Sequence, residues 1–450
     1  MSDMSSERQY LDLFRTERAL LDAGSCAPLN ACRDAAADAL ARRGLPSQKV
    51  ERYKYCDAQA AFAPDYGLNL RRALAEDNPY ETYRCGVPNL STSLYFVVND
   101  VVPPTTACTA PLPEGVIVTS LCEAARKMPD FIGKFYHRIA GKSDDAVTAL
   151  NTMLVQDGIL VYIPDGVSLK HTIQLVNISA AAGNLMSNRR ILIVAGRGAE
   201  ATILFCDHAF GEQHFLTTQV VEVFADEMAK IDLYSIEETS AGNTRFNNVC
   251  TEQQAGSRVS YNGVMLTCGQ TRNQLDFHLL GPGASTVANG AVIADGSQRV
   301  DNNILVEHAA PGCTSDLLYK YVLNGHSVGA FAGKVLVQRD AQQTASQQTN
   351  ANLCASPTAR AFSQPMLEIY ADDVKCNHGS SIGKLDETAL FYMRQRGIPE
   401  AEARLLLQHA FINDVLQRVT LERLRDRLSH LVDLRFRGQL SKCRDCTMCH

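Results

Sequence analysis

Two cysteine–histidine pairs, each separated by one residue, are the clearest chemical signals in this sequence. Cys376 and His378 stand in "YADDVKCNHGSSIG", which begins at Tyr370, and Cys206 and His208 stand in "FCDHAF". Alternate residues of a strand project from one face, with α-carbons roughly 6.5 Å apart. This spacing is wide for a nucleophile and its base, but it suits two ligands of a shared metal or a ligand set that a partner completes.

The surroundings of the two pairs differ. For Cys206 and His208 we expect a core thiol beside a surface imidazole, because free cysteine is usually buried. The second pair lies among ionisable residues and is followed by a glycine that permits a bend. These neighbours are Asp372, Asp373, Lys375 and Gly379. The sequence therefore favours Cys376 and His378 as the candidate site.

Two enzyme classes are alternatives for this site. One is a cysteine hydrolase that uses Cys376 and His378, which requires a substrate pocket beside the thiol. The other is a carbohydrate-active β-helix enzyme, which needs paired carboxylates on one exposed face. Asp372 and Asp373 are adjacent, so on a strand they would point to opposite faces.

The C-terminal "CRDCTMCH" holds the densest group of soft ligands. Cys443, Cys446, Cys449 and His450 could converge on one zinc ion or an iron–sulfur cluster. "CTMCH" also matches the haem c attachment pattern, but covalent haem attachment is normally an exported process. The remaining interpretation is an exposed, oxidisable chain end.

The composition narrows the class of protein. The chain has 450 residues, a formal net charge of −6 and an odd count of 15 cysteines. It lacks a signal-peptide pattern and any run of about 18 apolar residues, so we expect a cytoplasmic protein with reduced thiols and no membrane insertion. The negative charge argues against nucleic acid as the partner. "GAFAGKV" and "GRGAEA" match phosphate-binding motifs poorly and are interpreted as turns of a β-solenoid.

Four regions are expected along the chain. Residues 1–150 form a mixed, largely helical and separately folded region, residues 151–385 a β-rich core, residues 386–440 a helical domain and residues 441–450 a cysteine-rich tail. In the core, small residues recur at a spacing of 28, and residues two places later are expected to point inward. The two series are Ala201, Ala229, Ser257, Ser285 and Cys313, and Ile203, Ile231, Val259, Val287 and Ser315. Just before these residues stand turn-formers such as Gly198, Gly256, Gly283 and Gly312. A fixed repeat of a turn followed by a strand favours a parallel β-solenoid.

Two segments near the end of the core carry further expectations. "QRDAQQTASQQTNAN" is either a linker or a set of polar ladders stacked between coils. After it, Asp386 is expected to cap a helix that ends at Gly397, and a second helix follows Pro399. Leucines at spacings of three and four predict a third helix, whose apolar stripe packs on the protein itself or docks a partner. These leucines are Leu421, Leu424, Leu428 and Leu431.

The long stretch "PMLEIYADDVKCNHGSSIGKLDETALFYMRQRGIPEAEARLLLQHAF" resembles the SufD type of the SufB/SufD family, which belongs to the SUF iron–sulfur cluster assembly scaffold. "ALNTMLVQDGILVYIPDGVSLKHTIQL", "AFAGKVLVQRDAQQTASQQTNANL" and "LPSQKVERYKY" resemble the same family. The resemblance covers about residues 45 to 430. Asn377 stands where the family frequently has serine, and the triple-cysteine tail lies outside the family motif.

The resemblance implies a right-handed parallel β-helix with helical regions at both ends. It also implies pairing with a SufB-like subunit and docking of a SufC-like ABC-type ATPase on the C-terminal helices, or a homodimer in isolation. His378 is then a candidate ligand of a nascent cluster at the SufB interface, with Cys376 as its companion. No tightly bound cofactor is expected, since iron or a nascent Fe–S cluster is shared with the partner only transiently. The chain itself would be a non-catalytic scaffold.

Overall fold

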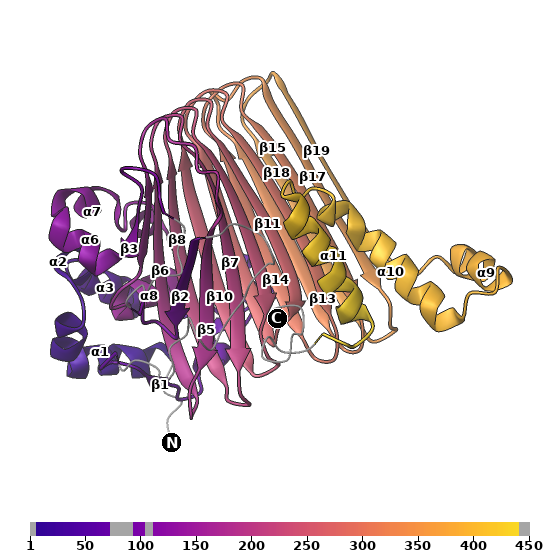
Figure 1. The fold of residues 1–450 in the computed structure, drawn as a ribbon, viewed down its shortest axis with the longest axis horizontal. Helices are drawn as coiled ribbons and strands as arrows, with labels where there is room; N and C mark the ends of the chain where they lie inside the picture. Colours follow the sequence, from indigo (N-terminus) through magenta and orange to yellow (C-terminus); the bar gives the residue numbers. More distant parts are fainter. Residues whose placement is uncertain (1–5, 73–92, 104–110, 441–450) are drawn as a thin grey trace.

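The computed structural model describes residues 6–72, 93–103 and 111–440, and its centre is a parallel β-solenoid of about eight turns (Figure 1). Each turn contributes one strand to a 10-stranded sheet and one to a 9-stranded sheet. Strands therefore pair with the second strand along the chain, as in β10 with β8 and β12. The expected fold class, mainly β with helices at both ends, is confirmed.

Even-numbered strands from β4 onward form one sheet, and odd-numbered strands from β5 onward form the other. The first sheet contains β1 (Gly67–Leu68), β3 (Ile117–Ser120), β4 (Ile159–Ile163), β6 (Leu185–Ala195), β8 (Phe215–Ala225), β10 (Asn243–Gln253), β12 (Gln270–Leu279), β14 (Arg299–His308), β16 (Val328–Val337) and β18 (Arg360–Ile369). The second contains β2 (Ser93–Val98), β5 (Ile173–Ala180), β7 (Glu200–Phe210), β9 (Lys230–Glu238), β11 (Arg258–Thr267), β13 (Ser285–Ala294), β15 (Thr314–Leu323), β17 (Thr344–Cys354) and β19 (Val374–Gly383).

The fixed 28-residue repeat is wrong in detail, although it pointed to the right architecture. Ile231 pairs with Val259 as that spacing requires, but Val259 pairs with Thr286 and not with Val287. Thr286 is buried and donates a hydrogen bond to Gln253, whereas Val287 lies on the outer face of β13. The turns between strands differ in length. The sequence spacing between equivalent residues therefore varies along the chain, while the paired strands stay in register.

The turns before several strands need a left-handed residue. Gly198, Gly256, Gly283 and Gly312 all have φ between 64° and 68°. An L-residue with a side chain is strained in this conformation, which is why glycine recurs at each of these turns. The sequence had indicated these four glycines as turn-formers, and the structure confirms them.

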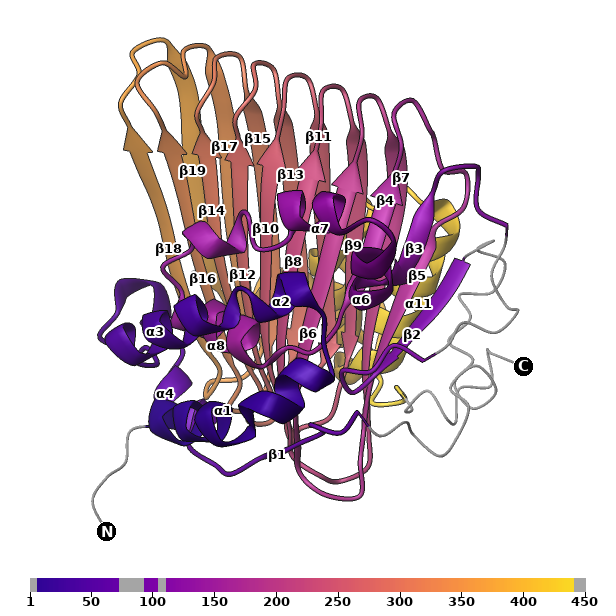
Figure 2. The ribbon, with the colours of Figure 1, turned by 90° about the vertical axis from the view of Figure 1, so that its left-hand side faces the viewer.

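The N-terminal helices cover the outer face of the 10-stranded sheet (Figure 2). They are α1 (Ser6–Ala23), α2 (Ala27–Asn30), α3 (Arg33–Arg43), α4 (Ala58–Phe62), α6 (Leu121–Lys127), α7 (Pro129–Phe135) and α8 (Ala146–Leu154), with 3₁₀ turns η1 (Glu51–Tyr53) and η2 (Ala140–Lys142). Residues 1–150 were expected to fold separately. The structure instead pairs β2 in parallel with β5, and β3 antiparallel with β4, so this region shares both sheets of the solenoid.

The C-terminal helices are α9 (Glu387–Gln395), α10 (Glu400–Leu416) and α11 (Glu422–Phe436). Asp386 caps α9 by accepting hydrogen bonds from the backbone of Thr388 and Ala389, at 2.8 and 3.1 Å. The leucine stripe of α11 packs with α10 on the outer face of the 9-stranded sheet, so it serves this chain's own core. By contrast α9 projects away from the solenoid, at the right of Figure 1.

No described helix is long and apolar enough to cross a membrane.

Candidate functional site

Cys376 and His378 lie on β19, the last strand of the 9-stranded sheet. β19 pairs with β17 on one side, and no described strand pairs with its other edge. Cys376 is in register with Ser346, and His378 with Gln348. Ser346 and Gln348 are buried on the inward face of β17, so both members of the pair continue that inward face into the final coil.

The Cys376 thiol is half-buried against a small apolar cluster that includes Val335, Val337, Ala341 and Ala371. Burial raises its pKa above the ordinary value for cysteine, and a backbone hydrogen bond near Ser346 offsets this only in part. A nucleophilic cysteine requires the opposite shift, because the thiolate is the reactive form. This environment argues against a cysteine hydrolase, and a metal ion would likewise have to displace the proton of this thiol in order to bind it.

The His378 side chain is exposed, and in the described part of the chain its imidazole has neither a hydrogen bond nor an ion pair. Asp372 and Asp373 lie in the bend before β19, not on the strand. The backbone of Asp373 binds Gln342 and Gln343, which ties this bend to the previous coil. The two carboxylates are exposed in this turn. They do not flank a groove, as the paired carboxylates of a carbohydrate-active enzyme would.

The coil that carries the pair is the open end of the solenoid, defined here as β18 and β19. Nearly all residues of both strands are partly or fully exposed, whereas strands of the preceding coils are mostly buried. Buried polar atoms of Gln348 and Asn352, on the strand beneath this end, and of Ser363 on β18 have no hydrogen-bond partner among the described residues. The preceding coils also contain such atoms, for example in His308 and Tyr319, so it is the exposure of β18 and β19 that distinguishes the open end.

Cys376 and His378 are two donors of the kind that binds iron. Among residues 6–72, 93–103 and 111–440, no group of three or more cysteine, histidine or acidic side chains is arranged to hold a metal ion. The geometry therefore offers a half-site, with imidazole and thiol on one face of an edge strand.

Cys206 and His208 lie on the outward face of β7. Cys206 is buried and accepts a hydrogen bond from Gln174 at 3.3 Å. The expectation of a surface imidazole is wrong, because His208 is only 6% exposed and its Nδ1 lies 3.6 Å from Glu238. Both members of this pair are therefore buried, and neither is part of an exposed site.

The glycine-containing motifs and the Gln-rich segment can also be located in the structure. "GRGAEA" forms the turn before β7 and the first residues of that strand, as expected, whereas "GAFAGKV" lies within strand β16 and is not a turn. "QRDAQQTASQQTNAN" contains most of β17, so it is not a linker. The expected polar ladder between coils is not formed either, because the buried Gln348, Asn350 and Asn352 are in register with Leu317, Tyr319 and Tyr321 of β15. Cys443, Cys446, Cys449 and His450 lie outside the described residues, so metal binding by the tail stays a prediction.

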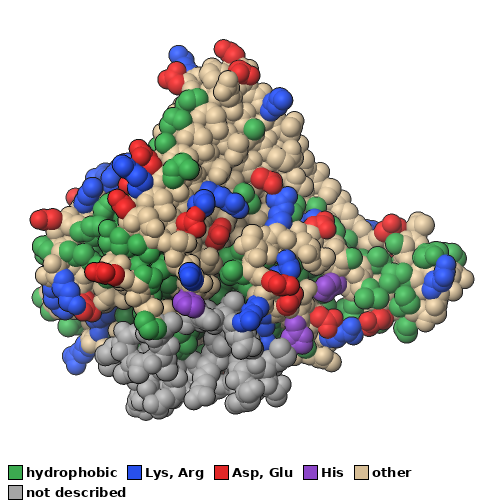
Figure 3. Space-filling view, turned by 45° about the horizontal axis from the view of Figure 1, so that its top comes forward, with side chains coloured by type: hydrophobic (Ala, Val, Ile, Leu, Met, Phe, Trp, Pro, Cys, Tyr) green, Lys and Arg blue, Asp and Glu red, His purple; other side chains and the backbone are tan. Residues whose placement is uncertain are grey.

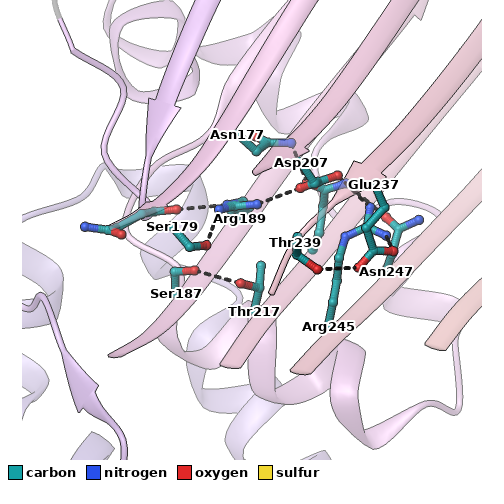
Figure 4. Close-up of polar contacts among 12 residues, drawn as sticks. Asn177, Ser179, Ser187, Arg189, Asp207, Thr217, Glu237, Thr239, Arg245 and Asn247 are labelled. Carbon is teal, nitrogen blue, oxygen red and sulfur yellow. Dashed lines mark hydrogen bonds and ion pairs between the residues drawn. The ribbon is translucent and has the colours of Figure 1, made fainter. Parts of the chain in front are cut away.

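A buried polar network inside the solenoid was not predicted from the sequence. Arg189 and Arg245 each lie 2.9 Å from Asp207, and Arg245 also lies 3.4 Å from Glu237 (Figure 4). Next to it runs an amide ladder with successive contacts of 2.9, 3.1 and 2.9 Å, made by Gln219, Asn247, Asn273 and Asn302. The recurrence of amides at solenoid spacing was the signal that could have revealed it.

Burial governs the electrostatics of this network. Desolvation is the largest influence on Arg189 and lowers its pKa, while it raises the pKa of Glu237. The oppositely charged side chains are therefore paired in a low-dielectric interior, where each charge alone would be unfavourable. These residues stabilise the coil, and neither Cys376 nor His378 belongs to the network.

Comparison with known protein families gives two matches that together cover most of the chain. Residues 177–411 match the SufBD core domain of SUF-system FeS cluster assembly, and residues 4–175 match the SufBD protein N-terminal region. The first match alone spans more than half of the sequence.

Curated relatives agree with these matches. An iron–sulfur cluster assembly SufBD family protein of Synechocystis is 27% identical over 417 residues, 90% of each chain. Protein ABCI7, chloroplastic, of Arabidopsis thaliana is 28% identical over 422 residues, 89% of this chain and 85% of that one. The iron–sulfur cluster assembly protein SufD of Bacillus subtilis is 23% identical over 322 residues, 71% of this chain and 74% of that one.

Proposed function

Since this chain belongs to the SufBD family of iron–sulfur cluster assembly proteins, we propose that it is the SufD-like scaffold subunit of a SUF assembly complex. Its open end would pair with a SufB-like subunit, and its C-terminal helices would dock a SufC-like ATPase. The observation that carries this proposal is the half-site on β19, where Cys376 and His378 face an uncovered coil.

The open end supports pairing with a related solenoid. Its strands expose backbone edges and apolar side chains such as Ile369 and Ile382, which are 38% and 55% exposed. A long exposed edge strand invites pairing by another chain and is otherwise a hazard for aggregation. A SufB-like subunit of the same fold would cover this end and bury these exposed apolar side chains.

At such an interface, His378 and Cys376 would supply a nitrogen and a sulfur ligand from one side, and the partner would supply the rest. Imidazole and thiolate are both suitable ligands for iron and for Fe–S clusters. The exposed imidazole can bind without breaking an existing contact, so His378 is the primary ligand. Cys376 must first lose its proton and move out of its apolar contact, so it is the secondary one. Iron and the nascent cluster are cargo in this account.

The projecting helix α9 supports docking of an ATPase. Phe391 and Tyr392 are 61% and 58% exposed, and Leu406 of α10 is also exposed. Figure 3 shows hydrophobic side chains gathered on the projecting part of the molecule, beside both signs of charge. Exposed aromatic residues with a charged rim are typical of interface hot spots. ATP hydrolysis would belong to that partner, and this chain would be non-catalytic and act in the cytoplasm.

Co-expression with a SufB-like and a SufC-like subunit tests the proposal. We expect one stable complex in size-exclusion chromatography, with Fe–S cluster formation on supply of iron, sulfide source and ATP. His378→Ala should leave the complex intact and reduce cluster formation severalfold. The control is His171→Ala, which removes an exposed imidazole between β4 and β5, far along the chain from β19. A chain that forms only a homodimer and binds neither partner would contradict the proposal.

A further inference from the structure

A cavity of about 630 Å³ lies on the outer face of the 10-stranded sheet, near its last strands. Its floor comes from the first residues of β14, β16 and β18, where Arg299, Val328 and Arg360 stand side by side in register. One wall is the loop before and after η1, which contributes Lys54 and Tyr55. The cavity is therefore made by segments about 300 residues apart in the sequence, and its size is in the range of small-molecule sites.

The charged side chains that line the cavity are all basic. Lys54, Arg299, Arg360 and His326 line it, and its lining contains no acidic side chain. Neither arginine forms an ion pair with a described residue, although the molecule has more acidic than basic groups overall. The carboxylate of Asp301, two residues after Arg299 on the same face, is buried and held by Arg272. The two guanidinium groups are thus left to bind an external anion.

The spacing of these arginines fits more than one anionic oxygen group. Arg299 and Arg360 flank Val328, so their backbones are separated by two strand spacings, roughly 9.6 Å. Long side chains can converge from that separation on a phosphate chain between them. Guanidinium groups bind phosphate oxygens in a bidentate manner, which makes arginine the preferred residue for this purpose.

An aromatic wall adds a second feature. Phe362, two residues after Arg360 on the same face of β18, stacks on Tyr55 with ring centroids 4.9 Å apart. The ammonium of Lys54 lies 5.4 Å from the centroid of the Tyr55 ring, whereas Phe362 remains 39% exposed. A planar ring could therefore stack on the uncovered part of Phe362, beside the arginines.

We propose that this cavity binds a nucleoside phosphate, with its phosphates on Arg299 and Arg360 and its base against Phe362. The site lies on the outer face of the sheet, away from Cys376 and His378, and the inference does not depend on the scaffold role. A plain polyphosphate would use the arginines alone. The contribution of Phe362 separates the two ligands.

The test is displacement of a fluorescent ADP analogue from the full chain by unlabelled ADP and by pyrophosphate, followed by anisotropy. Arg299→Ala and Arg360→Ala should each weaken ADP binding roughly tenfold or more, because a charge-assisted hydrogen bond is lost. Arg258→Ala is the matched control, since Arg258 is the exposed first residue of β11 in the other sheet. It should change binding less than about twofold.

Phe362→Ala should weaken ADP binding about fivefold and leave pyrophosphate binding unchanged. All these side chains are exposed, and circular dichroism will verify that the variants fold. The proposal is overturned if unlabelled ADP does not displace the analogue, or if the arginine variants bind as tightly as the Arg258 control. Equal binding of ADP and pyrophosphate, unaffected by Phe362→Ala, would overturn the assignment of a nucleoside phosphate.

Discussion

The middle coils and the last coil of the solenoid share one architecture, but they differ in the burial and pairing of their inward-facing polar side chains. In the middle coils, Arg189, Asp207 and Arg245 are almost completely buried and paired with one another. In the last coil, Cys376 is half-buried and His378 is exposed on the same inward face. In the middle coils the neighbouring coils supply the hydrogen-bond and ion-pair partners. The last coil has a neighbour on one side only, so its polar groups are left for another molecule.

Removing a charge from the middle coils should have the largest effect. Asp207→Ala leaves Arg189 and Arg245 buried without their shared carboxylate. Breaking a buried ion pair in this way costs about 3–5 kcal/mol of unfolding free energy. The measurement is the denaturant midpoint, with Asp373→Ala of the exposed bend as the control. That control should change stability by less than about 0.5 kcal/mol, and equal losses in both variants would remove the contrast between the coils.

The next effect is the pH dependence of a buried histidine. Burial lowers the pKa of His308 from 6.5 to about 4, and its Nε2 lies 2.9 Å from the Ser315 hydroxyl. Because the folded pKa is depressed, its stabilising contribution is complete above pH 6.5 and is lost as pH falls from 6.5 towards 4. The loss is about 3 kcal/mol at most. We expect His308→Gln to flatten this part of the stability curve, and parallel curves for the two proteins would show that His308 is not responsible.

Partner binding through the projecting helix should change by a smaller amount. Replacing Phe391 and Tyr392 together with serine removes two exposed aromatic side chains from α9. Interface hot spots contribute about 2 kcal/mol or more, so affinity for the ATPase subunit should fall at least about thirtyfold. Calorimetric titration will measure this, and the melting temperature of the isolated chain should stay the same. Unchanged ATPase affinity would place that interface elsewhere.

The smallest effect concerns the edge of the open end. Ile382→Lys places a charge on β19 at a side chain that is 55% exposed, so the isolated chain should keep its stability within about 0.5 kcal/mol. Charged residues on an edge strand oppose pairing with another chain. Affinity for the SufB-like subunit should fall about tenfold, as measured by surface plasmon resonance. Arg258→Ala serves as a control on the same sheet, and if both variants bind alike the open end is not the interface.

Much of the fold could be predicted because its signals are local. The turn glycines, the Asp386 cap and the leucine stripe of α11 each depend on neighbouring residues. The register could not be predicted, because turn lengths vary and a shift of one residue reverses Thr286 and Val287 between the two faces. The pairing of β2 with β5 joins distant segments, and no local pattern encodes it.

Only the shared face of the candidate pair can be compared with the structure, and its role as a ligand set stays a prediction. The spacing of Cys376 and His378 indicated a shared face, and the register with Ser346 and Gln348 bears this out. The burial of His208 was missed, since it depends on packing between strands, with Glu238 of β9 lying 30 residues further along the chain. Similarly, Lys54 and Arg360 gave no joint signal, because the cavity between them forms only on folding.

His378 is the proposed ligand of iron or of a nascent cluster at the interface of the open end. Pulsed electron paramagnetic resonance of the reduced, cluster-loaded complex tests this directly through the nuclear coupling of a ligating nitrogen. We expect an imidazole nitrogen signal in the wild-type complex and in His171→Ala, and its loss in His378→Ala. A nitrogen coupling that survives in His378→Ala, or one that is absent from the wild-type complex, would contradict the account.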